Sequence, residues 1–408
     1  MNSHSDSDSC FPDWGNDEVV QRLRNYLKIP SVHPNVDYDD CVIFLSNQAK
    51  ILDLPVSVHE LVARKPVVVM TWTGLRPELP AILLNSHMDV VPVYEDFWTF
   101  PPFAADITEE GWIIARGAQD MKSVGMMHLE AVRRLKNAGV RLKRTVHISF
   151  VPDEEINSID GMRKFAESEQ FRRLNVGFGL DESTPTLDDK VIMAFHGERT
   201  ARQIRVTSRA EPGHGLKLSS NTAGEKLHYV IGKLMDLRAE QKQIFDNGAP
   251  LGGVITINLT QLEGGVQFNV LPENLTATFD IRIPPTVDHD EFEKKILTWC
   301  AEAGDDVSFE YIEKNPMIEE TKIDDSNPFW TALYGAVKKM GLDISCAICP
   351  GATDARFVRR QGIPVINFSP ILKTPELLHA HDERIHVDTY KKGIDIMEKV
   401  LVAVANVD

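Results

Sequence analysis

Three consecutive acidic residues, Asp153, Glu154 and Glu155, are the feature of this sequence with the clearest chemical potential. They follow residues 146–151, an apolar run rich in β-branched side chains that predicts a buried strand. Pro152 ends the strand because it has no backbone N–H to donate. Adjacent carboxylates repel one another, and a metal ion is the simplest partner that would let them stay ionised together. The sequence therefore predicts a metal site just beyond the carboxyl end of a strand.

Histidines and further acidic residues follow other predicted elements in the same manner. His87 and Asp89 come after one expected strand, and Glu182 comes after another. The remaining candidates are Asp120, His379 and His381. Each of these sites is weak evidence by itself, since a His-x-Asp after a strand is more often a capped turn. All of them fall on one predicted edge of one sheet, and imidazole and carboxylate groups without thiolates favour zinc, with cobalt or manganese as alternatives.

The elements that must position these residues alternate between strands and helices, which predicts an α/β domain with a largely parallel sheet. Helices are expected where apolar residues recur at helical spacing, and strands where apolar runs are short. In chain order, the pattern gives helices at 16–27 and 39–54, strands at 66–72, 79–84 and 112–115, a helix at 121–138, a strand at 145–151, a helix at 161–169 and a strand at 176–180.

The pattern changes after about residue 197, where polar and apolar residues alternate as in half-exposed strands. We expect an α+β sandwich in this region, inserted into the α/β domain. Its elements are strands at 202–208, 253–262 and 275–283 and helices at 221–241 and 290–303; helices at 328–340 and 388–405 then resume the first pattern. The expected divisions are a first catalytic part at 1–198, a lid and dimerisation domain at 199–314, and a second catalytic part at 315–408.

The composition excludes several classes of partner. The 408 residues carry a net charge of −16, which disfavours nucleic acid and anionic membranes as partners. No apolar run approaches the roughly 20 residues that span a bilayer. Residues 1–10 are polar and acidic and lack the features of a signal peptide, so we expect a disordered tail and a cytoplasmic protein. The five cysteines are scattered and do not form a disulfide pattern.

The motifs that carry these residues resemble those of the dizinc aminoacylase, acetylornithine deacetylase and carboxypeptidase family. They occur in the family's order along nearly the whole chain. The matching segments are residues 84–93 (LNSHMDVVPV), 115–122 (ARGAQDMK), 150–155 (FVPDEE), 180–182 (LDE), 212–214 (PGH), 262–266 (LEGGV) with Asn269, 280–282 (DIR), 352–356 (ATDAR) and 377–384 (LLHAHDER).

The resemblance implies two zinc ions bound by five residues. His87, Asp120 and Glu182 would hold one ion, and Asp120 would bridge to a second ion held with Glu155 and His379. His379 is preferred over His381 because it sets the family's His-x-x-Asp-Glu spacing.

The resemblance also assigns roles beside the metals. Asp89 would orient His87 as an outer-shell carboxylate, and Glu154 would be the general base. Asp153 receives no role beyond that of an outer-shell residue or of a residue that shapes the loop.

Substrate-binding residues are also implied by the resemblance. His214 would donate a hydrogen bond to the oxyanion and would reach the site from a partner subunit of a homodimer formed through the lid domain. Arg356 is the best candidate to pair with the α-carboxylate of the substrate, because a guanidinium binds a carboxylate in bidentate fashion. Asn269 would contribute from the lid, whereas Arg282 fits either a substrate contact or a structural ion pair.

The activity implied is hydrolysis of N-acyl-L-amino acids to a carboxylate and a free L-amino acid. A dipeptidase or carboxypeptidase of the same family is the nearest alternative, since it differs only on the acyl side of the bond. A non-catalytic binding protein on the same fold is a third alternative. Its signature would be loss of the base or of a ligand, and this sequence retains all of them.

Overall fold

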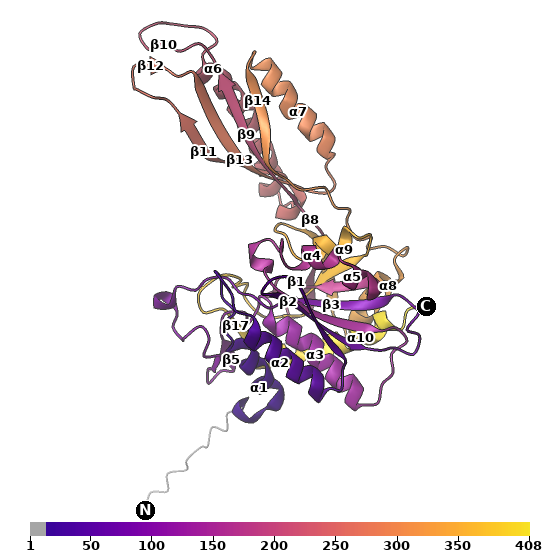
Figure 1. Cartoon of the computed structure of the whole chain (residues 1–408). Coiled ribbons are helices and arrows are strands. Elements are labelled where there is room, and N and C mark those ends of the chain that lie inside the picture. Colours follow the sequence, from indigo (N-terminus) through magenta and orange to yellow (C-terminus); the bar gives the residue numbers. More distant parts are fainter. Residues whose placement is uncertain (1–13) are drawn as a thin grey trace, which may run out of the picture. The chain divides into compact units, whose positions relative to one another are not determined.

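The computed structural model describes residues 14–408, which form two compact units (Figure 1). The first unit contains the described residues up to His196 together with Thr321–Cys346 and Thr353–Asp408; the second contains Gly197–Glu320 and Ala347–Ala352. The expected N-terminal tail lies outside the described residues. No helix within residues 14–408 is long and apolar enough to cross a membrane, and the cytoplasmic location stays a prediction.

An eight-stranded sheet forms the centre of the first unit. Its strand order is β1-β2-β6-β3-β7-β16-β8-β15. The strands β3, β6, β7 and β16 form its parallel part, and β1, β2 and β8 pair with their neighbours in antiparallel fashion. The bounds are β1 Val56–Val62, β2 Lys65–Trp72, β3 Ala81–His87, β6 Val146–Val151, β7 Val176–Asp181, β8 Val191–Glu198, β15 Asp343–Cys349 and β16 Val365–Phe368.

Helices cover both faces of this sheet, as the buried pattern of β2 shows. Val68 and Met70 belong to the core under one set of helices, whereas Val67 and Val69 belong to a second core on the opposite face. The larger core is formed with α1 Glu18–Leu27, α2 Asp39–Ile51, α3 Lys122–Asn137, α8 Pro328–Lys339 and α10 Val387–Ala405. The smaller core is formed with α4 Met162–Ala166, α5 Glu169–Arg173 and α9 Ala355–Arg359.

A small three-stranded sheet brings two distant loops together in the first unit. Its order is β17-β5-β4, formed by Arg384–His386, Trp112–Ile114 and Asp106–Ile107. Because β17 is antiparallel to β5, the segment before β17 meets the segment after β5, and Ala115 N donates to Glu383 O at 3.0 Å. The loops that carry Asp120 and His379 therefore start from neighbouring strands.

The second unit is an antiparallel sheet covered by two helices. Its order is β11-β13-β9-β14, and residues on β9 alternate between buried and half-buried, as the sequence pattern predicts. The helices α6 and α7 pack on the buried side around Ile204, Phe279 and Ile296. The bounds are β9 Thr200–Arg209, β10 Gly213–His214, α6 Ala223–Asp246, β11 Thr256–Gly264, β12 Val270–Leu271, β13 Asn274–Ile283, α7 His289–Glu302 and β14 Val307–Lys314.

These observations confirm the predicted fold class, an α/β domain with a largely parallel central sheet and an inserted α+β domain. Four short 3-10 turns complete the described structure. They are η1 Trp14–Asn16, η2 Glu95–Phe97, η3 Glu154–Ile156 and η4 Leu251–Gly253.

We predict that close packing of α3 on β3 depends on Gly125. A Cβ atom at this position would lie 2.5 Å from Ser86 Oγ and 3.0 Å from Phe150 Cε1. Gly125→Ala should therefore lower the free energy of unfolding by about 1–3 kcal/mol through overpacking. The matched control is Gly335→Ala in α8, where a Cβ meets nothing within 4 Å and the free energy of unfolding should rise by about 0.5–1 kcal/mol. Denaturant unfolding measures both, and equal shifts would contradict the packing argument.

Candidate metal centre

Two groups of histidine and carboxylate side chains share Asp120. The first consists of His87, Asp120 and Glu182, and the second of Asp120, Glu155 and His379; within each group the potential ligand atoms lie within 4.8 Å of one another. His87 Nε2 lies 3.0 Å from Asp120 Oδ1 and 3.5 Å from Glu182 Oε1. His379 Nε2 lies 3.2 Å from Asp120 Oδ2 and 3.0 Å from Glu155 Oε2. Each oxygen of Asp120 thus faces a different group, as a bridging carboxylate requires.

The parallel strands explain why these residues meet. His87 is the last residue of β3, Glu182 follows β7, and Glu155 lies in η3 just after β6. Since β3 pairs in parallel with both β6 and β7, the three carboxyl ends lie at one edge of the sheet. Asp120 lies two residues before the start of α3, and His379 lies in the loop before β17.

Glu383 holds the loop of Asp120 beside the loop of His379. Its fully buried carboxylate pairs with Arg116 Nη1 at 2.8 Å, and Arg116 Nη2 donates to His379 O at 3.2 Å. The same carboxylate accepts hydrogen bonds from three main-chain amides in one short segment, those of Gly117, Gln119 and Asp120. The sequence interpretation gave Glu383 and Arg116 no role. Their only signal was their position inside the motifs at 377–384 and 115–122.

The ring of His87 is oriented by a main-chain oxygen. His87 Nδ1 lies 2.9 Å from Asp89 O, whereas its distance to the carboxylate oxygen Oδ1 of Asp89 is 3.7 Å. A carbonyl oxygen only accepts hydrogen bonds, so Nδ1 carries a proton and Nε2 is the nitrogen that is directed toward Asp120 and Glu182 and is placed to bind a metal ion. The carboxylate of Asp89 instead accepts from Glu154 N at 3.2 Å and Glu155 N at 3.0 Å.

The donor atoms fit divalent cations. His87 Nε2 faces the carboxylate oxygens of Asp120 and Glu182, which only accept hydrogen bonds. Such an arrangement needs either a proton or a metal ion between the nitrogen and the oxygens. Glu155 Oε1 is buried and has no hydrogen-bond partner among the described residues. Nitrogen and carboxylate oxygen are the ligands that zinc and related metals prefer, and no thiolate is present in either group.

The electrostatics of the two groups show an excess of negative charge. Burial and the charge of Asp120 raise the pKa of Glu155 to about 7. Burial and the charge of Glu182 raise the pKa of Glu154 well above its ordinary value. Hydrogen bonds with Asp120 and Glu155 raise the pKa of His379 to about 10. The raised pKa values mean that these side chains tend to bind protons, because no other positive charge balances the carboxylates. A metal cation bound between them would supply that positive charge.

The other residues singled out from the sequence belong to neither metal group. His381 belongs to neither group and stacks on Phe97, with ring centroids 5.4 Å apart. Arg356 lies on α9 and its Nη2 donates to Asn157 O at 2.9 Å. The remaining three are in the second unit, namely His214 on β10, Asn269 just before β12, and Arg282 on β13.

Comparisons with known proteins agree with this architecture. The family model described as Peptidase family M20/M25/M40 matches residues 83–403. Aminoacylase-1 of Mus musculus is 45% identical over 390 residues, which cover 95% of each chain. An M20 family metallo-carboxypeptidase from Sulfolobus solfataricus has a TM-score of 0.71 at 19% identity, covering 95% of this chain and 99% of that chain.

A second solved structure is a Bacillus subtilis protein described as a dinuclear metal binding peptidase from the M20 family. It has a TM-score of 0.65 at 16% identity, covering 95% of this chain and 98% of that chain. At these identities the two structures establish a shared fold, whereas the family model and the aminoacylase-1 relative establish common descent. The chain belongs to peptidase family M20/M25/M40, a family of metal-dependent hydrolases, and within it to the relatives of aminoacylase-1.

Proposed function

We propose that this protein hydrolyses N-acyl-L-amino acids to a carboxylate and a free L-amino acid at a dinuclear metal centre. The observation that carries the proposal is the pair of histidine and carboxylate groups that share Asp120. The identity of 45% to an aminoacylase-1 over 95% of both chains supports this substrate class. Retention of every proposed ligand and of Glu154 disfavours a non-catalytic binding protein.

The proposed ligands are His87, Asp120 and Glu182 for one ion and Asp120, Glu155 and His379 for the other. Two zinc ions are proposed, because imidazole and carboxylate groups suit zinc, with cobalt and manganese as alternatives. When bound, two such ions acidify a shared water and polarise the substrate carbonyl.

Glu154 is proposed as the general base. Its carboxylate lies close enough to Glu182 and His87 for their charges to shift its pKa, and its amide is held by Asp89 Oδ1 at 3.2 Å. Its carboxylate accepts a proton from the attacking water and then gives it to the nitrogen of the leaving amine. Glu155, one residue later, is directed toward His379 instead.

Recognition of the substrate is proposed for three side chains. Arg356, fixed at one nitrogen by Asn157 O, binds the α-carboxylate, and Asn269 contributes a hydrogen bond. His214 donates to the oxyanion. Arg282 is held by Asp280 through two contacts of 2.8 and 3.0 Å, which favours the structural ion pair over a substrate contact.

A homodimer through the second unit is also proposed. The strand β11 lies at an edge of its sheet and has unpaired backbone groups on one side. Large apolar side chains are strongly exposed on the same unit, which is typical of an interaction surface. They are Leu216, Leu218, Leu262, Val266 and Phe268. A second copy would bury this surface with twofold symmetry and bring His214 of one protomer to its partner.

The first prediction from this proposal concerns metal content. Because Asp120 belongs to both groups, Asp120→Asn should lose both ions, whereas His379→Ala should lose one. His381→Ala is the control and should keep both, since His381 is in neither group. Elemental analysis after dialysis measures the stoichiometry. Full retention of two ions by Asp120→Asn would contradict the bridging role.

The second prediction concerns the reaction. The wild-type protein should hydrolyse N-acetyl-L-methionine in preference to dipeptides. Glu154→Gln should keep its metal but lose roughly 100- to 10,000-fold in kcat, because it removes the proton acceptor without changing the size of the side chain.

Two outcomes would refute these assignments. Exclusive turnover of dipeptides would favour the dipeptidase or carboxypeptidase alternative. Full activity of a metal-loaded Glu154→Gln protein would exclude Glu154 as the base.

The third prediction concerns His214. His214→Ala and Glu154→Gln homodimers should each be inactive, and mixing them with subunit exchange should restore activity. In an equal mixture about a quarter of the wild-type activity is expected, because about half of the dimers are hybrids with one complete site each. Absence of rescue, with exchange verified by tagged subunits, would show that His214 does not act across the interface.

A further inference from the structure

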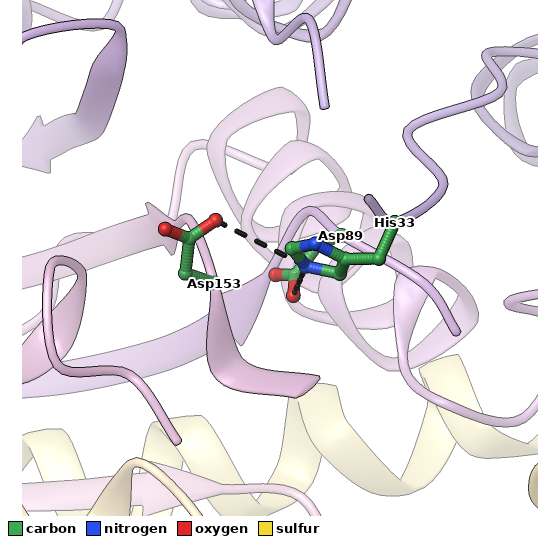
Figure 2. Close-up of side chains that lie close together, drawn as sticks. All are labelled: His33, Asp89 and Asp153. Carbon is green, nitrogen blue, oxygen red and sulfur yellow. Dashed lines mark hydrogen bonds and ion pairs between the residues drawn. The ribbon is translucent and has the colours of Figure 1, made fainter. Parts of the chain in front are cut away.

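A third group of potential ligands lies in the first unit, beside the two metal groups. His33, Asp89 and Asp153 are all buried, and their ligand atoms lie within 4.8 Å of one another. Figure 2 shows His33 Nε2 directed toward both carboxylates. The distances are 2.8 Å to Asp89 Oδ2 and 3.9 Å to Asp153 Oδ1. The composition of this group resembles a metal site, but its surroundings differ from those of the first two groups.

The positive charge of the third group is already supplied by a side chain. Lys65 Nζ lies 2.8 Å from Asp153 Oδ1 and 2.7 Å from Oδ2. Tyr38 donates its hydroxyl hydrogen to Asp153 Oδ1 at 2.7 Å. A cation placed here would be repelled by the ammonium group and would have to displace these bonds. The group is therefore complete without a metal ion.

The carboxylate of Asp89 connects this group to the residues of the reaction. It accepts hydrogen bonds from the amides of Glu154 and Glu155 and from the ring of His33. His33 is itself fixed by its neighbours, since its amide donates to Val90 O at 3.1 Å. Both the main chain and the ring of His33 are thus bonded to the segment that carries Asp89 and Val90.

Asp153 fixes the start of the turn that carries the base. It has a φ of 63°, in the left-handed region, which is uncommon for residues other than glycine. Its amide donates to the hydroxyl oxygen of Tyr38 at 3.0 Å, and its carboxylate is held by Tyr38 and Lys65. Both ends of this residue are therefore anchored to segments far earlier in the chain.

We propose that His33 is a positioning residue of the hydrolytic centre, with Asp153 and Tyr38 completing the same support. The N–H of His33 orients the Asp89 carboxylate, which holds the main chain of Glu154 and Glu155. This inference rests on the proposed function for its effect on turnover, but its effect on metal geometry is independent of the substrate.

The experiment compares two substitutions of His33 with a matched control. His33→Leu removes the donor, whereas His33→Gln retains an N–H group at a similar reach. The control is His128→Leu on α3, which replaces another buried histidine, one whose ring nitrogens have no hydrogen-bond partner among the described residues. The readouts are kcat and KM for N-acetyl-L-methionine, metal content, and the visible absorption spectrum of the protein loaded with Co²⁺, which reports ligand geometry.

His33→Leu should lower kcat by about 10- to 100-fold, the usual effect of losing an outer-shell partner, with KM within about threefold of wild type. Its Co²⁺ spectrum should differ from wild type, because the position of Glu155 changes. His33→Gln should recover most of kcat and the wild-type spectrum, and His128→Leu should match wild type. Tyr38→Phe, which removes only one hydroxyl, should change kcat and the spectrum in the same direction as His33→Leu.

Several outcomes would overturn the inference. Wild-type kcat and spectrum in His33→Leu would exclude a positioning role, and equal losses in His33→Leu and His33→Gln would show that ring packing matters instead of the donor. A third metal equivalent that disappears in His33→Leu would make the group a metal site. If His33→Leu does not fold, unchanged values in Tyr38→Phe refute the inference. If wild type hydrolyses no N-acyl amino acid, the proposed function fails, and the Co²⁺ spectra still decide the role of His33.

Discussion

Crowded negative charge is the constraint on which the rest of this structure depends. Four carboxylates, those of Asp120, Glu154, Glu155 and Glu182, gather around two histidines at one edge of the sheet. Buried like charges raise one another's free energy, and each must be neutralised by a proton, a cationic side chain or a metal ion. The raised pKa values of Glu154, Glu155 and Glu182, each due first to burial, show that the side chains alone leave this balance incomplete. A pair of divalent cations would complete it.

Two other buried carboxylates serve a different purpose, because their oxygens accept hydrogen bonds from the main chain and from side chains. Glu383 pairs with Arg116 and accepts main-chain amides from the loop of Asp120. Asp89 accepts a bond from His33 and the main-chain amides of Glu154 and Glu155. In both cases a carboxylate binds the backbone of a loop that carries proposed ligands. Loops are otherwise the most mobile parts of a domain, so such anchors are what makes a fixed ligand geometry possible.

The sequence predicts the parts of this architecture that depend on local pattern. Buried strands such as β6 follow from apolar runs, and the ends of parallel strands must share an edge, so His87 and Glu182 were expected to lie close together. The edge strand β1 was not expected, because it is largely exposed and Glu60 and Leu61 break its alternation of apolar and polar residues. The partners His33, Lys65 and Glu383 were also missed. Their roles arise from contacts between segments far apart in the chain, and of the three only Glu383 had a local signal, its position inside the motif at 377–384.

Support by hydrogen bonds also explains how residues without contact to the metal groups can affect them. A buried carboxylate that loses one of its bonds is left partly unsatisfied, at a cost of about 1–3 kcal/mol. If Asp89 shifts to regain a partner, the amides of Glu154 and Glu155 shift with it. About 1.4 kcal/mol corresponds to a tenfold change in rate or affinity, so the loss of a single bond in this support corresponds to a change of roughly 5- to 150-fold. The position of the proposed base, Glu154, therefore depends on the N-terminal segment around His33 and Tyr38 as well as on the strand that precedes it.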